Sequence, residues 1–112
     1  MNLDWQKEFP SAITVCDING VVLDMNDKSA DTFRDDGGKE LIGKSLNDCH
    51  SPASVEKIRE LLAAGSSNTY TIEKDGIKKL IHQAPWYEKG ELKGLVEISI
   101  VIPDGMPHFI RS

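Results

Sequence analysis

Two strand-forming segments near the start of the chain are separated by a tight-turn sequence. Residues 12–17 (AITVCD) and 21–25 (VVLDM) are rich in β-branched side chains, and Asp17-Ile18-Asn19-Gly20 joins them. Asn-Gly between two such runs favours a hairpin, because both residues tolerate positive φ. The pattern therefore predicts a β-hairpin.

A short helix is expected directly after this hairpin. Asn26 precedes residues 27–34, in which Ala30 and Phe33 fall on one side of a helix. The Asn side chain is a good N-cap because its oxygen accepts a hydrogen bond from a free backbone N–H. The glycines at 37 and 38 then end the helix.

The clearest helical segment begins after Ser51. Pro52 stands at the first helical position, where its missing N–H costs nothing, and Gly65 can end the helix in a left-handed conformation. Between these ends, apolar residues recur at helical spacing at Val55, Ile58, Leu61 and Leu62. This stripe predicts a helix that packs against the core.

From residue 68 onward the apolar period becomes two. Residues 68–74, 77–87 and 92–102 are typical of strands joined by short turns. In the last of them, Glu97 and Ser99 alternate with apolar residues, which predicts one buried and one solvated face. The residues expected on the buried face are Val96, Ile98, Ile100 and Ile102, and those expected to point outward are Leu95 and Val101.

This order of elements predicts an α+β fold. We expect a five-stranded antiparallel sheet, with the helices inserted after the second strand and covering one face. Residues 11–103 form the expected domain, with an N-terminal helical extension over residues 1–10 and a tail over residues 104–112.

Composition and charge narrow the functional classes. The 112 residues suffice for one domain, and 13 Lys and Arg against 18 Asp and Glu give a net charge of -5. Because the basic residues form no stripe, we expect no binding to nucleic acid. The polar start (MNLDWQKEFP) and the lack of a long apolar stretch predict a cytoplasmic protein that does not enter a membrane.

Residues with catalytic or metal-binding potential form no recognisable constellation in the sequence. Cys16 and Cys49 are too far apart for a CxxC pair, and two thiols do not make a tetrahedral metal set. Asp17-x-Asn19-Gly20 has glycine at the fourth position, whereas a calcium loop needs it at the sixth. No nucleophile motif or acid–base pair stands out, so we expect no catalytic activity.

Three stretches resemble the PAS family of sensor domains. Residues 17–26 match its D-x-x-G-x-[IV]-x-x-x-N pattern, residues 40–46 (ELIGKSL) look like its connector, and Gly94 precedes the last strand. The resemblance covers residues 8–103 and implies a sensory or interaction module that encloses a small pocket, often as a dimer coupled to an output domain. The family's usual D-I-T exit is replaced by Ile102-Pro103-Asp104, which argues against a continuous exit helix.

A pocket between the long helix and the sheet is expected to hold a small apolar or amphipathic molecule. Tyr70 and Trp86 offer polar tips for ligand hydrogen bonds, with core packing as their alternative role. His82 offers one polar group on the face of the pocket; its alternatives are a place in a dimer contact or a structural role with its hydrogen bonds satisfied. The ligand-contacting residues that we expect are Phe33, Leu46, Cys49, His50, Ile58, Leu62, Tyr70, His82, Trp86 and Ile98.

The resemblance also suggests two cofactors to consider, flavin and haem. Flavin-binding members need a cysteine in an N-C-R-F-L-Q type of motif, and the sequence around Cys49 (LNDCHSP) differs from it, so flavin is not expected. Haem-binding members take an axial His from the long helix or its approach, which makes His50 and His82 candidates. Cys49, close to a helix N-terminus, also fits either a reactive thiol or a buried apolar side chain.

Exposed apolar side chains predict a homodimer. Leu3, Trp5 and Phe9, with the outer sheet face that includes Leu95 and Val101, form the expected surface. Two alternatives to a small-molecule sensor stay open: a protein–protein interaction adaptor whose core is filled by its own side chains, and a haem-based gas or redox sensor. The sequence does not identify the signalling partner.

Overall fold

The structure is a computed structural model that describes residues 3–46 and 51–112. Two short 3-10 helices, Arg34–Asp36 and Gly38–Leu41, follow the first α-helix. The main elements are β1 (Ala12–Asp17), β2 (Val22–Met25), α1 (Asp27–Thr32), α2 (Pro52–Ala64), β3 (Asn68–Lys74), β4 (Ile77–Glu88) and β5 (Glu91–Val101).

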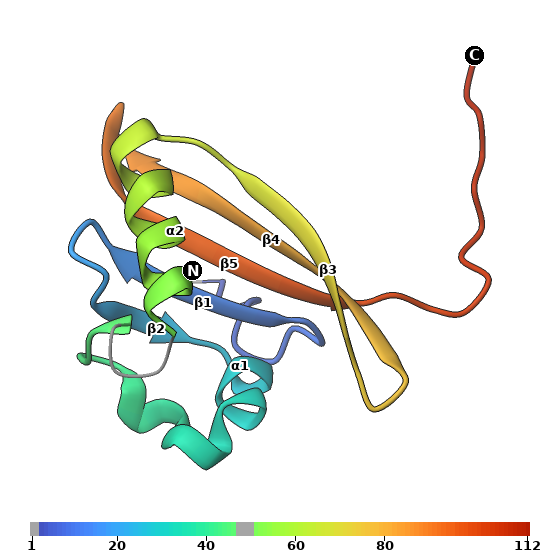
Figure 1. Ribbon diagram of the computed structural model, residues 1–112, viewed down its shortest axis with the longest axis horizontal. Coiled ribbons are helices and arrows are strands. Elements are labelled where there is room, and N and C mark those ends of the chain that lie inside the picture. The colour runs from blue at the N-terminus through green and yellow to red at the C-terminus, as the bar shows by residue number, and fades with distance from the viewer. Residues whose placement is uncertain (1–2, 47–50) are drawn as a thin grey trace.

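The strands of the described chain form one antiparallel sheet in the order β2-β1-β5-β4-β3. The opening hairpin therefore docks beside the closing strand, with Ile13 of β1 opposite Ile98 of β5. Figure 1 shows α2 and α1 on the same side of this sheet. The predicted α+β fold, with helices inserted after the second strand, is confirmed.

The residues predicted to begin and end α2 do so in the structure. The side chain of Ser51 accepts a hydrogen bond from the Ser54 N–H at 3.2 Å, and Gly65 ends α2 with a φ of 62°. The first helix is shorter than expected, because it passes into a 3-10 turn after Thr32. No helix in the described ranges is long and apolar enough to cross a membrane.

The core lies between α2 and the inner face of the sheet, which is the face that the helices cover. From α2, Ile58 and Leu61 are buried, and Leu62 packs against them with partial exposure. The other buried members come from β1, β2, β5 and the segment between α1 and α2: Cys16, Val22, Met25, Leu41, Leu46 and Leu95.

The prediction for the two faces of β5 is wrong. Leu95 is only 3% exposed and belongs to the core, and Glu97 and Ser99 follow it on the same inner face. Val101 shares that inner side by the same alternation. Val96, Ile98 and Ile100 belong to the outer face, which the helices do not cover. Alternation separates the two faces of a strand but does not tell which one the helices cover.

The N-terminal extension also differs from the prediction. Residues 3–10 form turns rather than a helix, with the Lys7 N–H bonded to the Asp4 carbonyl and the Phe9 N–H to the Gln6 carbonyl. So short a segment gains too few hydrogen bonds to offset helix nucleation. The rings of Trp5 and Phe9 meet edge to face, with centroids 5.5 Å apart.

The tail beyond β5 extends away from the rest of the molecule, as Figure 1 shows in red. Its apolar residues Met106, Phe109 and Ile110 are all exposed. The guanidinium of Arg111 lies 5.5 Å from the centroid of the Phe109 ring. The tail therefore adds nothing to the core.

Candidate functional site

A small cavity lies in the core between α2 and the inner face of the sheet. Its volume is about 30 Å³. A water molecule needs roughly 10–15 Å³ of such space, so the cavity can hold one or two waters but no organic ligand. The lining residues are Thr14, Cys16, Val22, Met25, Phe33, Leu41, Leu46, Ile58, Gln83, Leu95 and Glu97.

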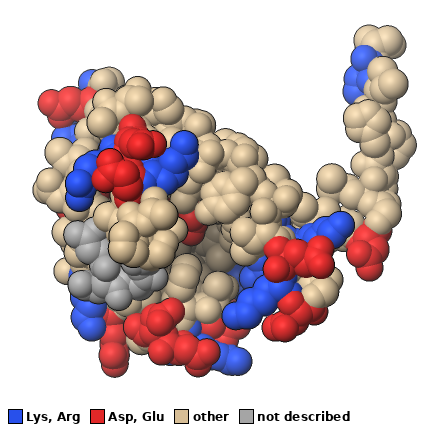
Figure 2. Space-filling view, in the orientation of Figure 1, with Lys and Arg blue, Asp and Glu red and all other residues tan. Residues whose placement is uncertain are grey.

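A larger groove continues along the inner face of the sheet, beyond the end of α1. Its volume is about 220 Å³, and Thr14, Phe33 and Glu97 line both the groove and the cavity. Figure 2 shows this side of the molecule hollowed between the helices and the long strands. The other lining residues of the groove are Ala12, Thr32, Tyr70, Ile72, Lys79, Ile81 and Ser99. Cavity and groove together form the candidate ligand site.

Polar side chains form a continuous row across the inner face at this site. Thr14, Glu97, Gln83 and Asn68 are register partners on β1, β5, β4 and β3. The Asn68 amide donates to Gln83 Oε1 at 3.1 Å, and Gln83 Nε2 donates to Glu97 Oε1 at 2.9 Å. The Thr14 hydroxyl forms a hydrogen bond with that of Ser29 on α1. This polar row gives an otherwise apolar site fixed hydrogen-bonding groups.

The charge of Glu97 acts on its neighbours. Burial raises the pKa of the Tyr70 phenol above its ordinary value, and the negative charge of Glu97 raises it further. Burial also raises the pKa of the Cys16 thiol; a backbone hydrogen bond with Leu95 opposes this shift, and the charges of Asp17 and Glu97 add to it. Cys16 is therefore a buried, protonated thiol at neutral pH rather than a reactive one.

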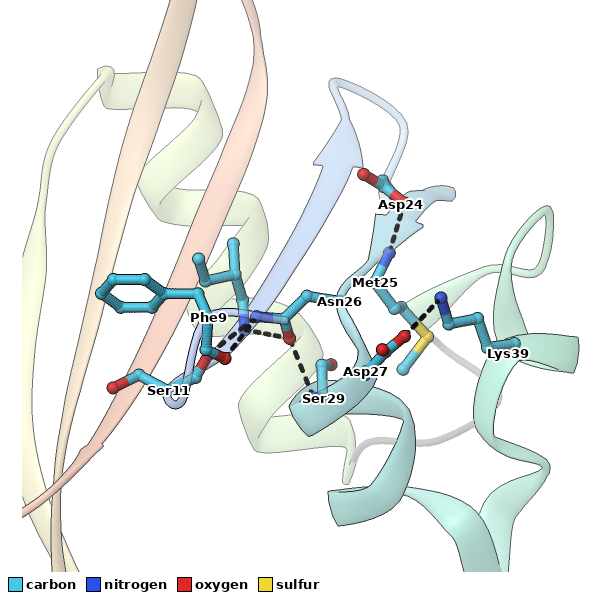
Figure 3. Close-up of polar contacts among 9 residues, drawn as sticks. Phe9, Ser11, Asp24, Met25, Asn26, Asp27, Ser29 and Lys39 are labelled. Atoms are coloured by element: carbon cyan, nitrogen blue, oxygen red, sulfur yellow. Dashed lines mark hydrogen bonds and ion pairs between the residues drawn. The ribbon is translucent and has the colours of Figure 1, made fainter. Parts of the chain in front are cut away.

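Asn26 ties together the elements that border the site. Its Oδ1 accepts hydrogen bonds from the backbone N–H groups of Ile13 and Ser29, both at 2.9 Å. Its Nδ2 donates to the carbonyl oxygens of Ser11 at 2.8 Å and Phe9 at 3.4 Å. Figure 3 shows how this one side chain joins the N-terminal segment, β1 and α1. The predicted N-cap is confirmed, and its further contacts position α1 at the edge of the groove.

Part of the predicted set of site residues meets at the candidate site. Phe33, Leu46 and Ile58 line the cavity, and Tyr70 lines the groove. Leu62 lies at the side of α2 that faces the β1–β2 turn, where it lines an open surface hollow of about 540 Å³ with Ile18 and Leu92. This hollow shares Leu46 and Ile58 with the cavity. Cys49 and His50 fall outside the described residues.

Three other predicted site residues lie elsewhere. His82 and Ile98 are register partners on the outer face of the sheet, and His82 Nδ1 is hydrogen-bonded to the Thr69 hydroxyl at 2.7 Å. The indole of Trp86 donates to the Cys16 carbonyl at 3.0 Å and does not line the cavity or the groove. His82 and Ile98 were placed at the site because the faces of β4 and β5 were assigned the wrong way round.

The site residues that the sequence analysis missed include the three members of the polar row that line the cavity, Thr14, Gln83 and Glu97. Each is a polar residue within a strand, and the period of two assigns such residues to the solvent. A usable signal was present: the three residues occupy one register row once the strands are paired around Gly94. That row becomes visible only when the strand order is known.

The closed cavity of about 30 Å³ has no room for a porphyrin. Of the two predicted axial ligands, His82 lies on the outer face of the sheet, and His50 falls outside the described residues. Within the described ranges, no group of three or more His, Cys, Asp and Glu side chains gathers to hold a metal ion.

A twisted antiparallel sheet of this order, with helices on one face and a cavity between them, defines a class of α+β sensor domains. The family model described as "PAS fold" matches residues 7–104. This match covers most of the chain, and the protein therefore belongs to the PAS family of sensory and signalling domains. A search among curated proteins found no match.

Solved structures agree with this assignment. The PAS domain of BvgS from Bordetella pertussis is 24% identical, with a TM-score of 0.65 over 90% of this chain and 83% of that one. VqmA of Vibrio cholerae, bound to DPO, is 19% identical, with a TM-score of 0.68 over 88% and 54%. The haem oxygen sensor Aer2 of Vibrio cholerae is 14% identical, with a TM-score of 0.62 over 83% and 95%. At these identities the likeness concerns the fold.

Proposed function

We propose that this PAS domain is a cytoplasmic, non-catalytic sensor that binds a small molecule between the helices and the inner face of the sheet. The observation that carries the proposal is the polar row of Thr14, Gln83 and Glu97, which lines the cavity and continues into the apolar groove through Thr14 and Glu97. Polar groups held in fixed positions within an apolar concavity are the common design of small-molecule sites. The groove supplies the entrance and most of the room.

Two solved neighbours support the idea of a ligand-binding role. VqmA was solved with DPO bound, and Aer2 is described as a haem oxygen sensor. For this chain the small volume of the closed cavity and the position of His82 on the outer face favour a small organic ligand over haem. The remaining alternative is an interaction adaptor whose core is filled by its own side chains, and the small size of the closed cavity is the feature that it explains best.

Native mass spectrometry of the purified protein, with thermal shifts against a panel of metabolites, separates these two functions. A sensor carries a co-purified mass or is stabilised by at least one compound, because a ligand that binds only the folded state raises its stability. An adaptor shows neither effect. A visible spectrum recorded after addition of hemin tests the alternative of a haem sensor, because bound haem would give a sharp Soret band.

We also propose that the protein forms a homodimer through the outer face of the sheet and the N-terminal residues Leu3, Trp5 and Phe9. Trp5 is 63% and Leu3 72% exposed, which is unfavourable for large apolar side chains in a lone molecule. Leu95 and Val101, which were expected in this surface, lie on the inner face instead. The outer face carries other apolar side chains: Val15, Leu80, Ala84, Val96, Ile98 and Ile100. VqmA is described as a dimer, which supports the proposal.

A further inference from the structure

Resting on the proposed function, we infer that the ligand is a small organic cation, an amine or amidine on an apolar body, whose charged group binds Glu97 at the boundary between cavity and groove. The three features that carry this inference are the charge of the lining, the fixed position of the carboxylate and the shape of the groove.

Glu97 is the one charged residue in the described lining of the cavity. The groove adds Lys79, which precedes Gln83 by four positions on the inner side of β4. Four residues of a strand span about 13 Å, so Lys79 stands well along the groove from Glu97. In the described parts of the chain Glu97 has no ion-pair partner within 4.0 Å. A ligand at this boundary therefore meets an uncompensated negative charge.

Among the residues that the structure describes, the side chain that holds the Glu97 carboxylate by a hydrogen bond is the neutral Gln83. Gln83 is only 6% exposed, and Asn68 occupies its Oε1, which orients the Gln83 Nε2 donor toward Glu97. One amide hydrogen bond does not replace the hydration that a half-buried carboxylate loses. A ligand N–H that carries positive charge supplies the missing partner, whereas an anionic ligand is repelled.

The rest of the groove suits a small apolar body. Phe33, Ile72 and Ile81 line it together with the ring of Tyr70. Its volume of about 220 Å³ lies below the roughly 300 Å³ at which sites for drug-sized ligands begin. The groove therefore fits a compact body such as one aromatic ring with a short chain.

Three matched probes test the inference on the wild-type protein: 2-phenylethylamine, 2-phenylethanol and 3-phenylpropionate. Binding of each probe is monitored by ¹H–¹⁵N spectra at pH 7. They share a ring and differ in the charge of the head group. We expect the amine to shift the amide signals of Thr14, Gln83 and Glu97, with an affinity at least about tenfold above that of the alcohol. We expect the carboxylate not to bind.

Glu97→Gln removes the charge with almost no change of shape and should weaken amine binding about tenfold while leaving alcohol binding unchanged. Glu73→Gln is the matched control, because Glu73 is exposed and lies on the outer side of the edge strand β3. A dispersed spectrum of each variant verifies its fold.

The outcomes separate the ligand class from the function itself. If the alcohol or the carboxylate shifts the same amides as strongly as the amine, the inference of a cationic ligand is wrong, but the proposal of a small-molecule site is retained. If none of the probes shifts these amides at millimolar concentration, the cation is likewise rejected. The sensor function is then judged by the co-purified mass in native mass spectrometry.

Discussion

Gly94 lies directly against the backbone of Cys16, at the point where β5 pairs with β1. A Cβ atom on Gly94 would overlap the Cys16 carbonyl oxygen and crowd the Asp17 Cα. The same carbonyl accepts the hydrogen bond of the Trp86 indole at 3.0 Å. Only glycine allows the opening hairpin and the closing strands to come this close, and the register of the polar row depends on that approach.

The Gly94→Ala variant is therefore expected to lose about 3 kcal/mol of stability or more, because the added methyl group has no space without backbone movement. Urea unfolding measures the loss. Gly90→Ala is the matched control: Gly90 has a φ of +80° but open space around a Cβ, so only conformational strain of about 1 kcal/mol is expected. Equal losses in the two variants would contradict the packing that we describe.

The two donors and the acceptor of Asn26 predict graded effects of substitution. Asn26→Asp keeps the cap at Ser29 but places a carboxylate against the carbonyl oxygens of Ser11 and Phe9, and should cost about 2 kcal/mol. Asn26→Ala also loses the cap and should cost about 3 kcal/mol. Chemical denaturation compares both with Asn19→Ala, at an exposed turn position where little change is expected. An Asp variant as stable as the wild type would show that the donors are unimportant.

The raised pKa of the Cys16 thiol predicts how stability varies at alkaline pH. As the pH rises through the ordinary thiol pKa of about 9, the unfolded chain releases its proton first, so the stability that burial of the neutral thiol contributes is lost progressively. Unfolding free energies measured from pH 7 to 10 should therefore fall less steeply in Cys16→Ala than in the wild type. A Cys49→Ser background leaves Cys16 as the remaining thiol, which should resist alkylation in the folded protein. Rapid labelling at pH 8 would contradict its burial.

The outer face predicts the oligomeric state. Light scattering should give twice the mass of one chain at high concentration, and Trp5→Asp or Ile100→Asp should restore the monomer, because each places a charge in the apolar surface. Ile77→Asp is the control: Ile77 is 51% exposed and lies on the inner side of β4. A wild-type monomer at high concentration, or equal dissociation by Ile77→Asp, would refute the interface.

The sequence predicts the elements of this fold far better than the orientation of the strands. Caps and turns are local, so Asn26, Ser51 and Gly65 are recognisable from their neighbours alone. The inner and outer faces of β5 cannot be recognised in this way, because the inner face is the one that α2 covers. Here the covered face carries Glu97, and the uncovered face is more apolar. The family motifs identify the PAS fold for the same reason as the caps, since they consist of short local stretches.

The candidate site was harder to predict than the fold. Phe33, Leu46, Ile58 and Tyr70 were found because apolar spacing and alternation mark them as facing inward. Gln83 and Glu97 were missed because burial of polar groups becomes favourable only through partners on other strands, and these partners are distant in the sequence.

The position of a bound ligand tests the central claim most directly. ¹H–¹⁵N spectra of the labelled protein, recorded with the metabolite that gives the largest thermal shift, report on both faces of the sheet at once. The small-molecule sensor predicts shifts of Thr14, Gln83 and Glu97 on the inner face, with little change at His82 and Ile98 on the outer face. Shifts confined to the outer face, or a panel without any stabilising compound and no co-purified mass, would contradict it.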